Sequence, residues 1–307
     1  MEETDPLFDI KTNYYIGNYQ GAINEARSGV SARNVAKEKK QIWIYRAELG
    51  LGEINLVLEE IPRGESDVSL ELQALRIYAE YLYQKESSSK AAEDGLVHLQ
   101  NILRHGPGDS DLVLLLCAQL AFSMGKFDDS LRCTLQAHQS NLESHALAIQ
   151  NYLALHRPDL ADKEWLAMKA LEEDAPLSQL ARAWISAYVG GDRLREAKTI
   201  FEELIDAHQA TPLLLNSLAG CFMRAEQFPS AEKLLLRALE INNKDPDTLV
   251  NLIVCSHHLP DSSDSSKRYL RTLRSCATLH PWILSVSQQE ATFDSLADSY
   301  LSSLGRV

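Results

Sequence analysis

The chain has 307 residues, of which 45% are apolar and 24% charged, and its net charge is −13. This apolar share is enough to build a core and excludes a largely disordered chain. The acidic balance argues against a nucleic-acid-binding protein, which needs a basic surface to neutralise phosphates. The length admits either two globular domains or one elongated array of repeats.

Features that direct a chain to or across a membrane are missing from this sequence. The N-terminal segment is acidic and has no apolar stretch of the kind found in signal peptides. The longest apolar run, Leu112 to Phe122, is far shorter than the ~20 residues that span a bilayer. Five scattered cysteines without a CxxC pair fit a reducing compartment. We therefore expect a cytoplasmic protein that reaches a membrane only indirectly, through a partner.

One short pattern recurs along the chain: a large apolar residue, two further residues, and a small residue that opens an amphipathic run. Clear copies are Tyr19-Gln-Gly-Ala22, Phe127-Asp-Asp-Ser130, Leu194-Arg-Glu-Ala197 and Phe228-Pro-Ser-Ala231. Weaker copies end at Val57 and Ala161, and spacing alone places two more near Ala91 and Ser265. A period near 34 residues with a small anchor residue is typical of the tetratricopeptide helix–turn–helix unit.

Four prolines, at 176, 212, 246 and 281, recur with nearly the same period. Proline is tolerated in the first turn of a helix, so each is expected to begin the first helix of a unit. The fold class predicted is all-α: a tetratricopeptide-like α-solenoid of about eight helical hairpins with a C-terminal capping helix. We expect a single solenoid over residues 1–307, with repeats over roughly 7–280 and the capping helix over roughly 281–304.

Sequence motifs of catalysis and of phosphate or metal binding are absent. There is no GxGxxG, GxxxxGK[ST], GxSxG or HExxH. Cys255-Ser-His-His258 is the best candidate for metal ligands, but no further ligands occur at a suitable spacing. We therefore favour the interpretation that Cys255 is buried in a helix core and that the histidines lie near the helix end. The sequence therefore predicts no catalytic residue, no cofactor and no metal, and the chain is not expected to be an enzyme.

The concave face of such a solenoid is lined by places 2, 5, 9 and 12 of each first helix. Counting back from the anchors of the fourth and later repeats gives a mostly apolar lining, which is an interaction surface by default. Its predicted partner-binding residues are Leu112, Leu115, Gln119, Phe122, Ala146, Gln150, Leu153, Arg182, Ser186, Val189, Leu213, Asn216, Met223, Val250 and Val254. The same counting places five more residues inward: Glu143, Gln179, Gly220, Asp247 and His257.

Two uses of this lining remain open at the level of sequence. It could bury an extended or helical segment of a partner, or the solenoid could curl so tightly that these side chains pack on one another. A generic tetratricopeptide adaptor or chaperone-cofactor scaffold is the alternative function. Its chaperone form is weakly supported, because among the central repeats only Arg182 and Asn216 in the lining could clamp a carboxylate.

The N-terminal run Leu7-Phe-Asp-Ile-Lys-Thr-Asn-Tyr-Tyr-Ile-Gly-Asn-Tyr-Gln-Gly-Ala-Ile-Asn-Glu-Ala26 closely resembles the start of the epsilon-subunit family of coatomer. Later stretches resemble the same family in the same order: 44–47, 71–79, 212–216 and 248–254. Segments 62–68 and 85–111 match least. The resemblance implies a coat subunit of Golgi vesicles in retrograde and intra-Golgi transport. It implies a concave groove that binds the C-terminal region of the coatomer alpha subunit, contact with other coatomer subunits, and a peripheral place on Golgi membrane and coated vesicles.

Overall fold

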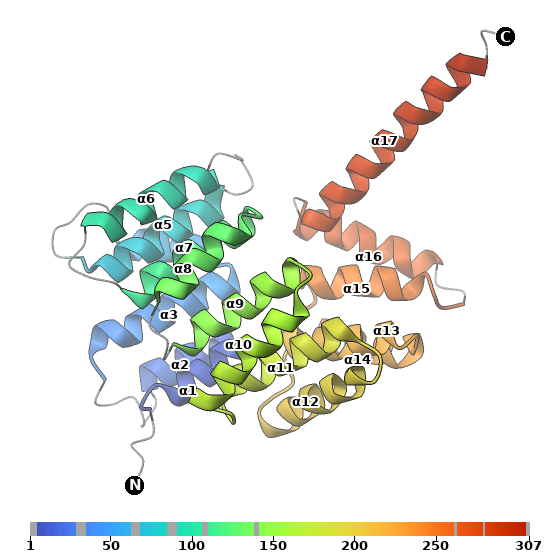
Figure 1. Ribbon diagram of the computed structural model, residues 1–307. Helices are drawn as coiled ribbons and strands as arrows, with labels where there is room; N and C mark the ends of the chain where they lie inside the picture. The colour runs from blue at the N-terminus through green and yellow to red at the C-terminus, as the bar shows by residue number, and fades with distance from the viewer. Residues whose placement is uncertain are drawn as a thin grey trace. The chain divides into compact units, whose positions relative to one another are not determined.

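The computed structural model describes residues 5–28, 35–62, 68–84, 91–105, 110–137, 141–260, 263–278 and 280–304. Figure 1 shows a chain built from helices, and no strand occurs in these ranges. The chain divides into two compact units, Met1–Leu214 and Leu215–Val307, and each is described by itself below. The prediction of one continuous solenoid over residues 1–307 stays a prediction.

The first unit consists of consecutive helical hairpins, and the helices of most pairs pack directly on each other. Its helices are α1(Phe8–Tyr15), α2(Tyr19–Ser28), α3(Lys37–Leu51), α4(Ile54–Glu60), α5(Leu70–Gln84), α6(Ala91–His105), α7(Asp111–Ser123), α8(Phe127–Gln136), α9(Leu142–Ala154), α10(Pro158–Leu171), α11(Pro176–Val189) and α12(Arg193–Ala207).

The second unit continues the pattern after the boundary, which falls within the first turn of α13. Its helices are α13(Pro212–Arg224), α14(Phe228–Ile241), α15(Pro246–Ser256), α16(Ser263–Cys276) and α17(Pro281–Leu304). Taken in order along the described chain, α1 to α16 form eight hairpins, and α17 follows as a single helix. This confirms the predicted fold class.

The small anchor residues explain how the two helices of a hairpin approach closely. The anchors lie three or four residues after the start of a second helix and are buried: Ala22, Ser130, Ala161, Ala197 and Ala231. In the two repeats placed only by spacing, the small residues Gly95 and Ser266 are buried, whereas Ser265 is half-buried.

The four periodic prolines each begin a first helix, as predicted: α11, α13, α15 and α17. Proline fits there because the N–H that it lacks would have no partner within the helix. At α15 the start is reinforced by Asp245, whose side chain accepts a hydrogen bond from the Thr248 backbone N–H at 2.9 Å. These local signals explain why sequence periodicity locates the first helices well.

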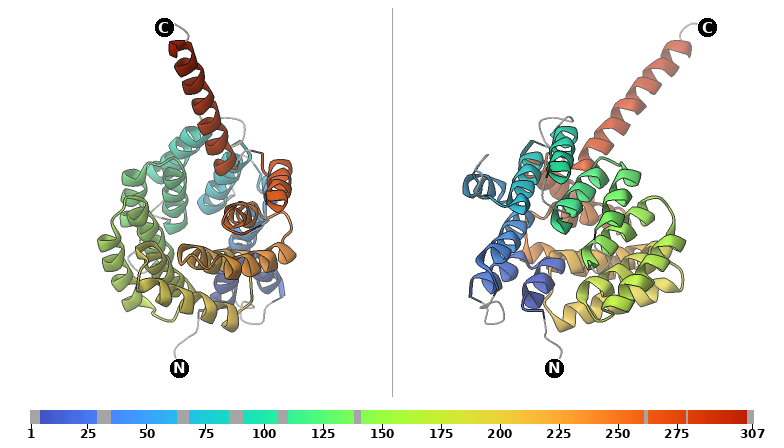
Figure 2. Two further views of the ribbon diagram at one scale, coloured as in Figure 1. Left: turned by 90° about the vertical axis from the view of Figure 1, so that its right-hand side faces the viewer. Right: turned by 60° about the vertical axis from the view of Figure 1, so that its left-hand side comes forward.

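The first unit is closed by a contact between its two ends. Helix α1 packs against α11 as well as α2 and α3 (Figure 2). At the end of α1, the backbone oxygen of Ile16 accepts a hydrogen bond from the Thr211 hydroxyl at 2.5 Å. The next residue, Gly17, has a φ of +82° and lies so close to Leu213 that a Cβ would come within 3.0 Å of its side chain. Glycine therefore serves both the turn and the close approach.

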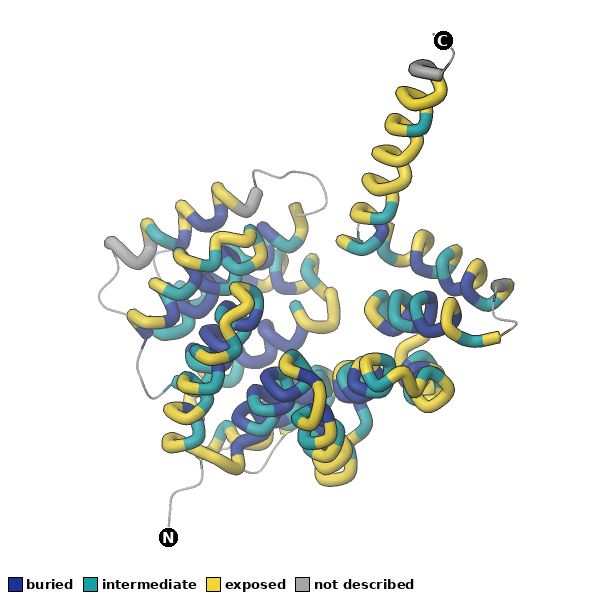
Figure 3. Tube along the Cα trace, turned by 45° about the vertical axis from the view of Figure 1, so that its right-hand side comes forward, coloured by how far each residue is buried: buried dark blue, intermediate teal, exposed yellow. Residues whose placement is uncertain are grey.

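The capping helix has the predicted bounds, but only its start packs on the second unit. Ile283 is buried in the core of that unit, and Trp282 packs against the same core. Figure 3 shows that the remaining turns of α17 are largely exposed. The capping of the last repeat is thus carried out by the first turns of α17 alone.

The core of the first unit should be sensitive to loss of volume at Phe201, which is 1% exposed on α12. We expect Phe201→Ala to lower the free energy of unfolding by about 3–5 kcal/mol, because the substitution leaves a cavity. Phe293→Ala on α17, where the ring is 72% exposed, is the matched control and should change it by less than about 0.5 kcal/mol. Urea titration followed by circular dichroism measures both, and equal effects would contradict this packing.

Candidate partner-binding site

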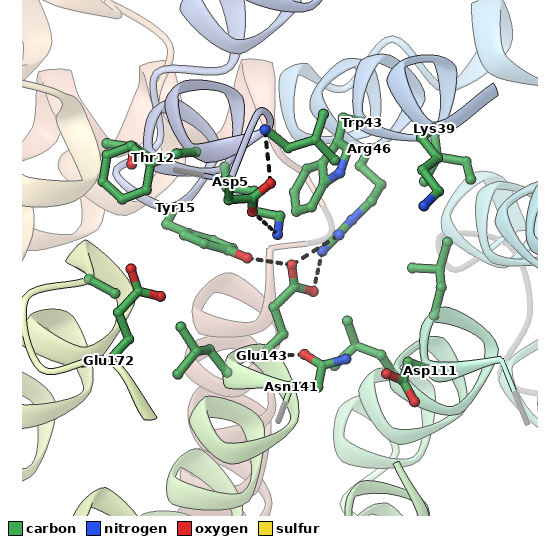
Figure 4. A pocket seen from close by; sticks show the side chains of 18 of the residues that line it. Asp5, Thr12, Tyr15, Lys39, Trp43, Arg46, Asp111, Asn141, Glu143 and Glu172 are labelled. Atoms are coloured by element: carbon green, nitrogen blue, oxygen red, sulfur yellow. Dashed lines mark hydrogen bonds and ion pairs between the residues drawn. The ribbon is translucent and has the colours of Figure 1, made fainter. Parts of the chain in front are cut away.

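The inner surface of the first unit contains an open pocket of about 710 Å³ (Figure 4). Helix α1 forms one wall, and α3 up to Arg46, the N-terminal parts of α5, α7, α9 and α11, and the last residue of α10 contribute to the remainder. The lining residues are Asp5, Leu7, Phe8, Lys11, Thr12, Tyr15, Lys39, Ile42, Trp43, Arg46, Glu71, Asp111, Leu112, Leu115, Asn141, Leu142, Glu143, Leu171, Glu172, Ala175 and Pro176. First helices of successive repeats therefore converge on one pocket.

A bidentate ion pair joins two walls of this pocket. Arg46 on α3 donates from Nη2 to Glu143 Oε2 at 2.7 Å and from Nη1 to Glu143 Oε1 at 3.1 Å. The Tyr15 hydroxyl on α1 donates to the same Oε1 at 2.6 Å. Figure 4 shows the three side chains meeting from three elements. The Arg46 and Glu143 side chains are only 7% and 13% exposed. The carboxylate therefore ties α1, α3 and α9 together.

Two further contacts hold the arginine and the glutamate in place. The guanidinium of Arg46 lies over the rings of Trp43 and Tyr14, with its carbon 4.2 and 4.7 Å from their centres. Such stacking stabilises a desolvated cation. Glu143 lies in the first turn of α9, where its backbone N–H donates to the side chain of the capping residue Asn141 at 3.0 Å. A negative charge in this first turn is also favoured by the helix dipole.

The protonation of these groups follows from burial and pairing. Burial alone raises the pKa of Glu143, but the Arg46 charge and the hydrogen bonds from Arg46 and Tyr15 outweigh it and hold this pKa below its ordinary value. Burial and the neighbouring Glu143 carboxylate raise the pKa of Tyr15 well above its ordinary value. Both shifts stabilise one state near neutral pH: an ionised glutamate between a cation and a neutral phenol.

Charged side chains around the pocket are predominantly acidic. The carboxylates that line it are Asp5, Glu71, Asp111, Glu143 and Glu172, and the cations are Lys11, Lys39 and Arg46. Lys11 pairs with Asp5 at 2.6 Å, and Glu71 accepts a hydrogen bond from the Ser110 hydroxyl at 3.1 Å. The pocket thus offers apolar walls with an excess of negative charge.

The predicted partner-binding residues of the first unit lie in several different environments. Leu112 and Leu115 line the pocket. Leu115, Ala146, Leu153 and Ser186 are buried within the chain itself. Gln119, Phe122 and Gln150 are half-buried, whereas Val189 and Leu213 are exposed. Some predicted lining residues of the first unit therefore pack inside the chain, as expected for a tightly curled solenoid. Others remain accessible, as expected for a surface that binds a partner.

Arg182 and Ser186 engage acidic residues of the same chain. Arg182 donates from Nε to Glu196 Oε1 at 2.7 Å and pairs with Asp162 at 3.2 Å. The Ser186 hydroxyl donates to Glu196 Oε2 at 2.7 Å. Arg193 pairs with Asp162 as well, at 2.7 Å. This polar network joins α10, α11 and α12. In it, the guanidinium of Arg182 and the hydroxyl of Ser186 both bind carboxylates of the same chain.

In the second unit the predicted residues lie on α13 and α15 and are half-buried: Asn216, Met223, Val250 and Val254. Asn216 donates to the Thr248 hydroxyl at 2.7 Å and accepts from Asn251 at 2.9 Å. Met223 and Val250 pack against the core of this unit. Asn216 therefore acts as a link between consecutive repeats.

Repeat counting does not predict Tyr15 or Arg46, nor pocket residues such as Phe8, although the sequence holds a signal for Arg46. The same four places counted back from the anchor Val57 give Lys39, Ile42, Arg46 and Leu49. Three of these four line the pocket. Counting from the fourth repeat onward excluded them, while Glu143 was placed inward correctly. The repeat pattern does not predict that Arg46 pairs with Glu143, because the two residues are 97 positions apart in different repeats.

In the described ranges, no three His, Cys, Asp or Glu side chains gather in a way that would hold a metal ion. None of the helices in this part of the chain combines the length and the apolar character needed to cross a membrane.

The consecutive helical hairpins define a tetratricopeptide-like α-solenoid, and comparison with solved structures supports this fold class. A tetratricopeptide repeat protein from Parabacteroides merdae superposes with a TM-score of 0.59 at 12% identity, covering 87% of this chain and 96% of that one. A thermophilic tetratricopeptide protein from Thermus thermophilus gives 0.52 at 18% identity, covering 60% and 98%. These similarities establish the fold alone.

The family follows from sequence comparison. The family model of the coatomer epsilon subunit matches residues 3–301. Coatomer subunit epsilon-1 of Arabidopsis thaliana is 32% identical over 98% of this chain and 99% of its own. Its namesake in Oryza sativa subsp. japonica is 36% identical over 89% and 91%, and coatomer subunit epsilon of Dictyostelium discoideum is 30% identical over 94% and 97%. The chain belongs to the coatomer epsilon-subunit family.

The buried ion pair should show strong coupling between its members. Arg46→Met leaves the Glu143 carboxylate buried without its cation and should lower the free energy of unfolding by about 3–5 kcal/mol. Adding Glu143→Gln removes the stranded charge while keeping an acceptor for Tyr15. We therefore expect the double variant to be more stable than Arg46→Met alone in urea unfolding. Additive losses from the two single substitutions would show that the pair is not coupled.

Proposed function

We propose that this chain is a non-enzymatic coatomer subunit that binds and stabilises the C-terminal region of the coatomer alpha subunit through the concave face of its first unit. It works in retrograde Golgi-to-ER and intra-Golgi transport. Family membership supports a place in the coatomer coat. The observation that carries the binding site is the pocket whose walls are held by Tyr15, Arg46 and Glu143.

The pocket suits a protein segment better than a small metabolite. It is open, and it combines aliphatic and aromatic walls with an excess of carboxylates. Phe8 and Leu112 expose apolar surface in it, while Glu71, Asp111 and Glu172 supply negative charge around them. A segment that inserts an apolar side chain next to a basic one would bury the first and pair the second. Walls fixed before binding reduce the ordering cost of association.

The location that we propose is the cytoplasm, with a peripheral position on Golgi membrane and coated vesicles. In this proposal the chain reaches the membrane through the coat, by binding the alpha subunit and meeting other coatomer subunits. Its acidic charge of −13 supports indirect attachment, because an acidic surface is repelled by anionic lipid.

The alternative of a chaperone-cofactor adaptor is weakened by the surroundings of Arg182. A clamp for a C-terminal carboxylate needs a basic side chain that is available to the ligand. Arg182 instead pairs with Glu196 and Asp162 of its own chain. Binding a peptide carboxylate would require breaking both pairs.

The proposal is tested by calorimetric titration with the C-terminal region of the alpha subunit. Phe8→Asp combined with Leu112→Asp places two charges on the apolar part of the pocket and should weaken binding by at least about tenfold, or 1.4 kcal/mol. The matched control is Leu135→Asp combined with Leu166→Asp, on exposed apolar residues of α8 and α10 in the same unit. This control should bind as the unmodified chain does.

Circular dichroism should show unchanged helix content in both double variants. Unaltered binding by the folded pocket variant would contradict the proposed site. An equal loss of affinity in the control variant would also contradict the proposed site. It would mean that the added negative charge, and not its position in the pocket, weakens binding.

A further inference from the structure

Helix α17 of the second unit presents an apolar surface that the fold leaves largely uncovered. Beyond the buried Ile283 near its start, Phe293 is 72% exposed, Leu296 65% and Leu301 64%. Figures 1 and 3 show these turns extending away from α15 and α16 as a single exposed rod. Isolated exposed apolar residues are ordinary, but several on one helix mark an interaction surface.

The exposed apolar residues lie on one side of the helix. Phe293, Leu296, Ala297 and Leu301 follow one another at intervals of three, one and four residues, and Val286 precedes Phe293 by seven. With 3.6 residues per turn these positions form one stripe along the axis. The opposite side is mostly polar and carries Gln288, Thr292, Ser295 and Ser299. The helix is therefore amphipathic, with its apolar stripe turned towards solvent.

A row of acidic side chains borders this stripe. Glu290, Asp294 and Asp298 are each four residues apart, so they lie above one another along one edge of the apolar residues. All three are exposed. The sequence from 281 to 304 contains no lysine or arginine that would neutralise them. Any occupant of the stripe thus meets three uncompensated negative charges along one side.

We propose that α17 is a second docking surface, whose occupant is an amphipathic helix of another protein with an apolar stripe edged by Lys or Arg. Burial of Phe293, Leu296 and Leu301 would supply the affinity. Pairing of basic side chains with Glu290, Asp294 and Asp298 would set orientation and select the partner. The proposal does not depend on the pocket of the first unit or on the alpha subunit.

A second copy of this chain fits the surface poorly. Two α17 helices packed stripe to stripe would bring two acidic rows together, without a cation between 281 and 304 to offset them. Helix α16 carries the basic residues Lys267, Arg268, Arg271 and Arg274 on its exposed side. Its apolar residues Tyr269 and Leu273 are buried in the core, so it offers no apolar stripe to Phe293. Charge and burial both favour a different protein.

The test uses the full chain and two synthetic helical peptides with the same leucine stripe, one edged by lysines and the other by glutamates. In fluorescence anisotropy at low salt, the lysine-edged peptide should bind at least about tenfold more tightly. Phe293→Asp with Leu296→Asp should weaken its binding about tenfold or more. Ser295→Asp with Ser299→Asp adds the same charge on the opposite face and should not weaken it. The pocket variant Phe8→Asp with Leu112→Asp should also bind it normally.

A charge reversal completes the test. In the triple variant Glu290→Lys, Asp294→Lys, Asp298→Lys, the preference should shift to the glutamate-edged peptide. Equal affinity of the unmodified chain for both peptides, no binding of either, or loss of binding in the serine-face control would overturn the proposal. Self-association that is abolished by Phe293→Asp with Leu296→Asp in sedimentation equilibrium would also overturn it, since it would make a second copy the occupant.

Discussion

The contact between Arg46 and Glu143 decides what the inner surface of the first unit can do. Without it, α1, α3 and α9 would contribute walls that are joined only by apolar packing. With it, a buried carboxylate receives hydrogen bonds from a guanidinium and a phenol that come from two other helices. A buried ion pair is often no more stabilising than apolar side chains of the same size, but it tolerates far less displacement. Its role here is to define how the walls of the pocket are placed.

The same constraint links the two ends of the first unit. Helix α1 is held on one side by Tyr15 and Glu143, and at its end by the Ile16–Thr211 hydrogen bond and the Gly17–Leu213 contact. A solenoid normally has contacts only between neighbouring repeats. Here the first helix also touches residues some two hundred positions later. An inner surface closed in this way is preorganised, and the pocket in it combines apolar side chains with five carboxylates.

Local signals in the sequence predicted most of the fold. Periodic prolines mark the starts of α11, α13, α15 and α17, and small anchors such as Ala197 and Ala231 mark the close approach of paired helices. The site was predicted less well. Glu143 and Leu112 follow from repeat counting, but the meeting of Arg46 with Glu143 depends on the superhelical turn of several repeats, which a period does not encode. The exposure of α17 was also only partly predictable, because an apolar stripe that covers a core and an apolar stripe that is exposed to solvent have the same spacing.

In the proposed function, the partner occupies the pocket bounded by α1, α3, α7 and α9. Hydrogen–deuterium exchange of the chain, alone and in complex with the C-terminal region of the alpha subunit, tests it most directly. We expect added protection in α1, in α3 from Lys39 to Arg46, and in the first turns of α7 and α9, with exchange in α8 and in the first turns of α10 unchanged. Protection confined to α8 and α10, or faster exchange in α1 on complex formation, would contradict it.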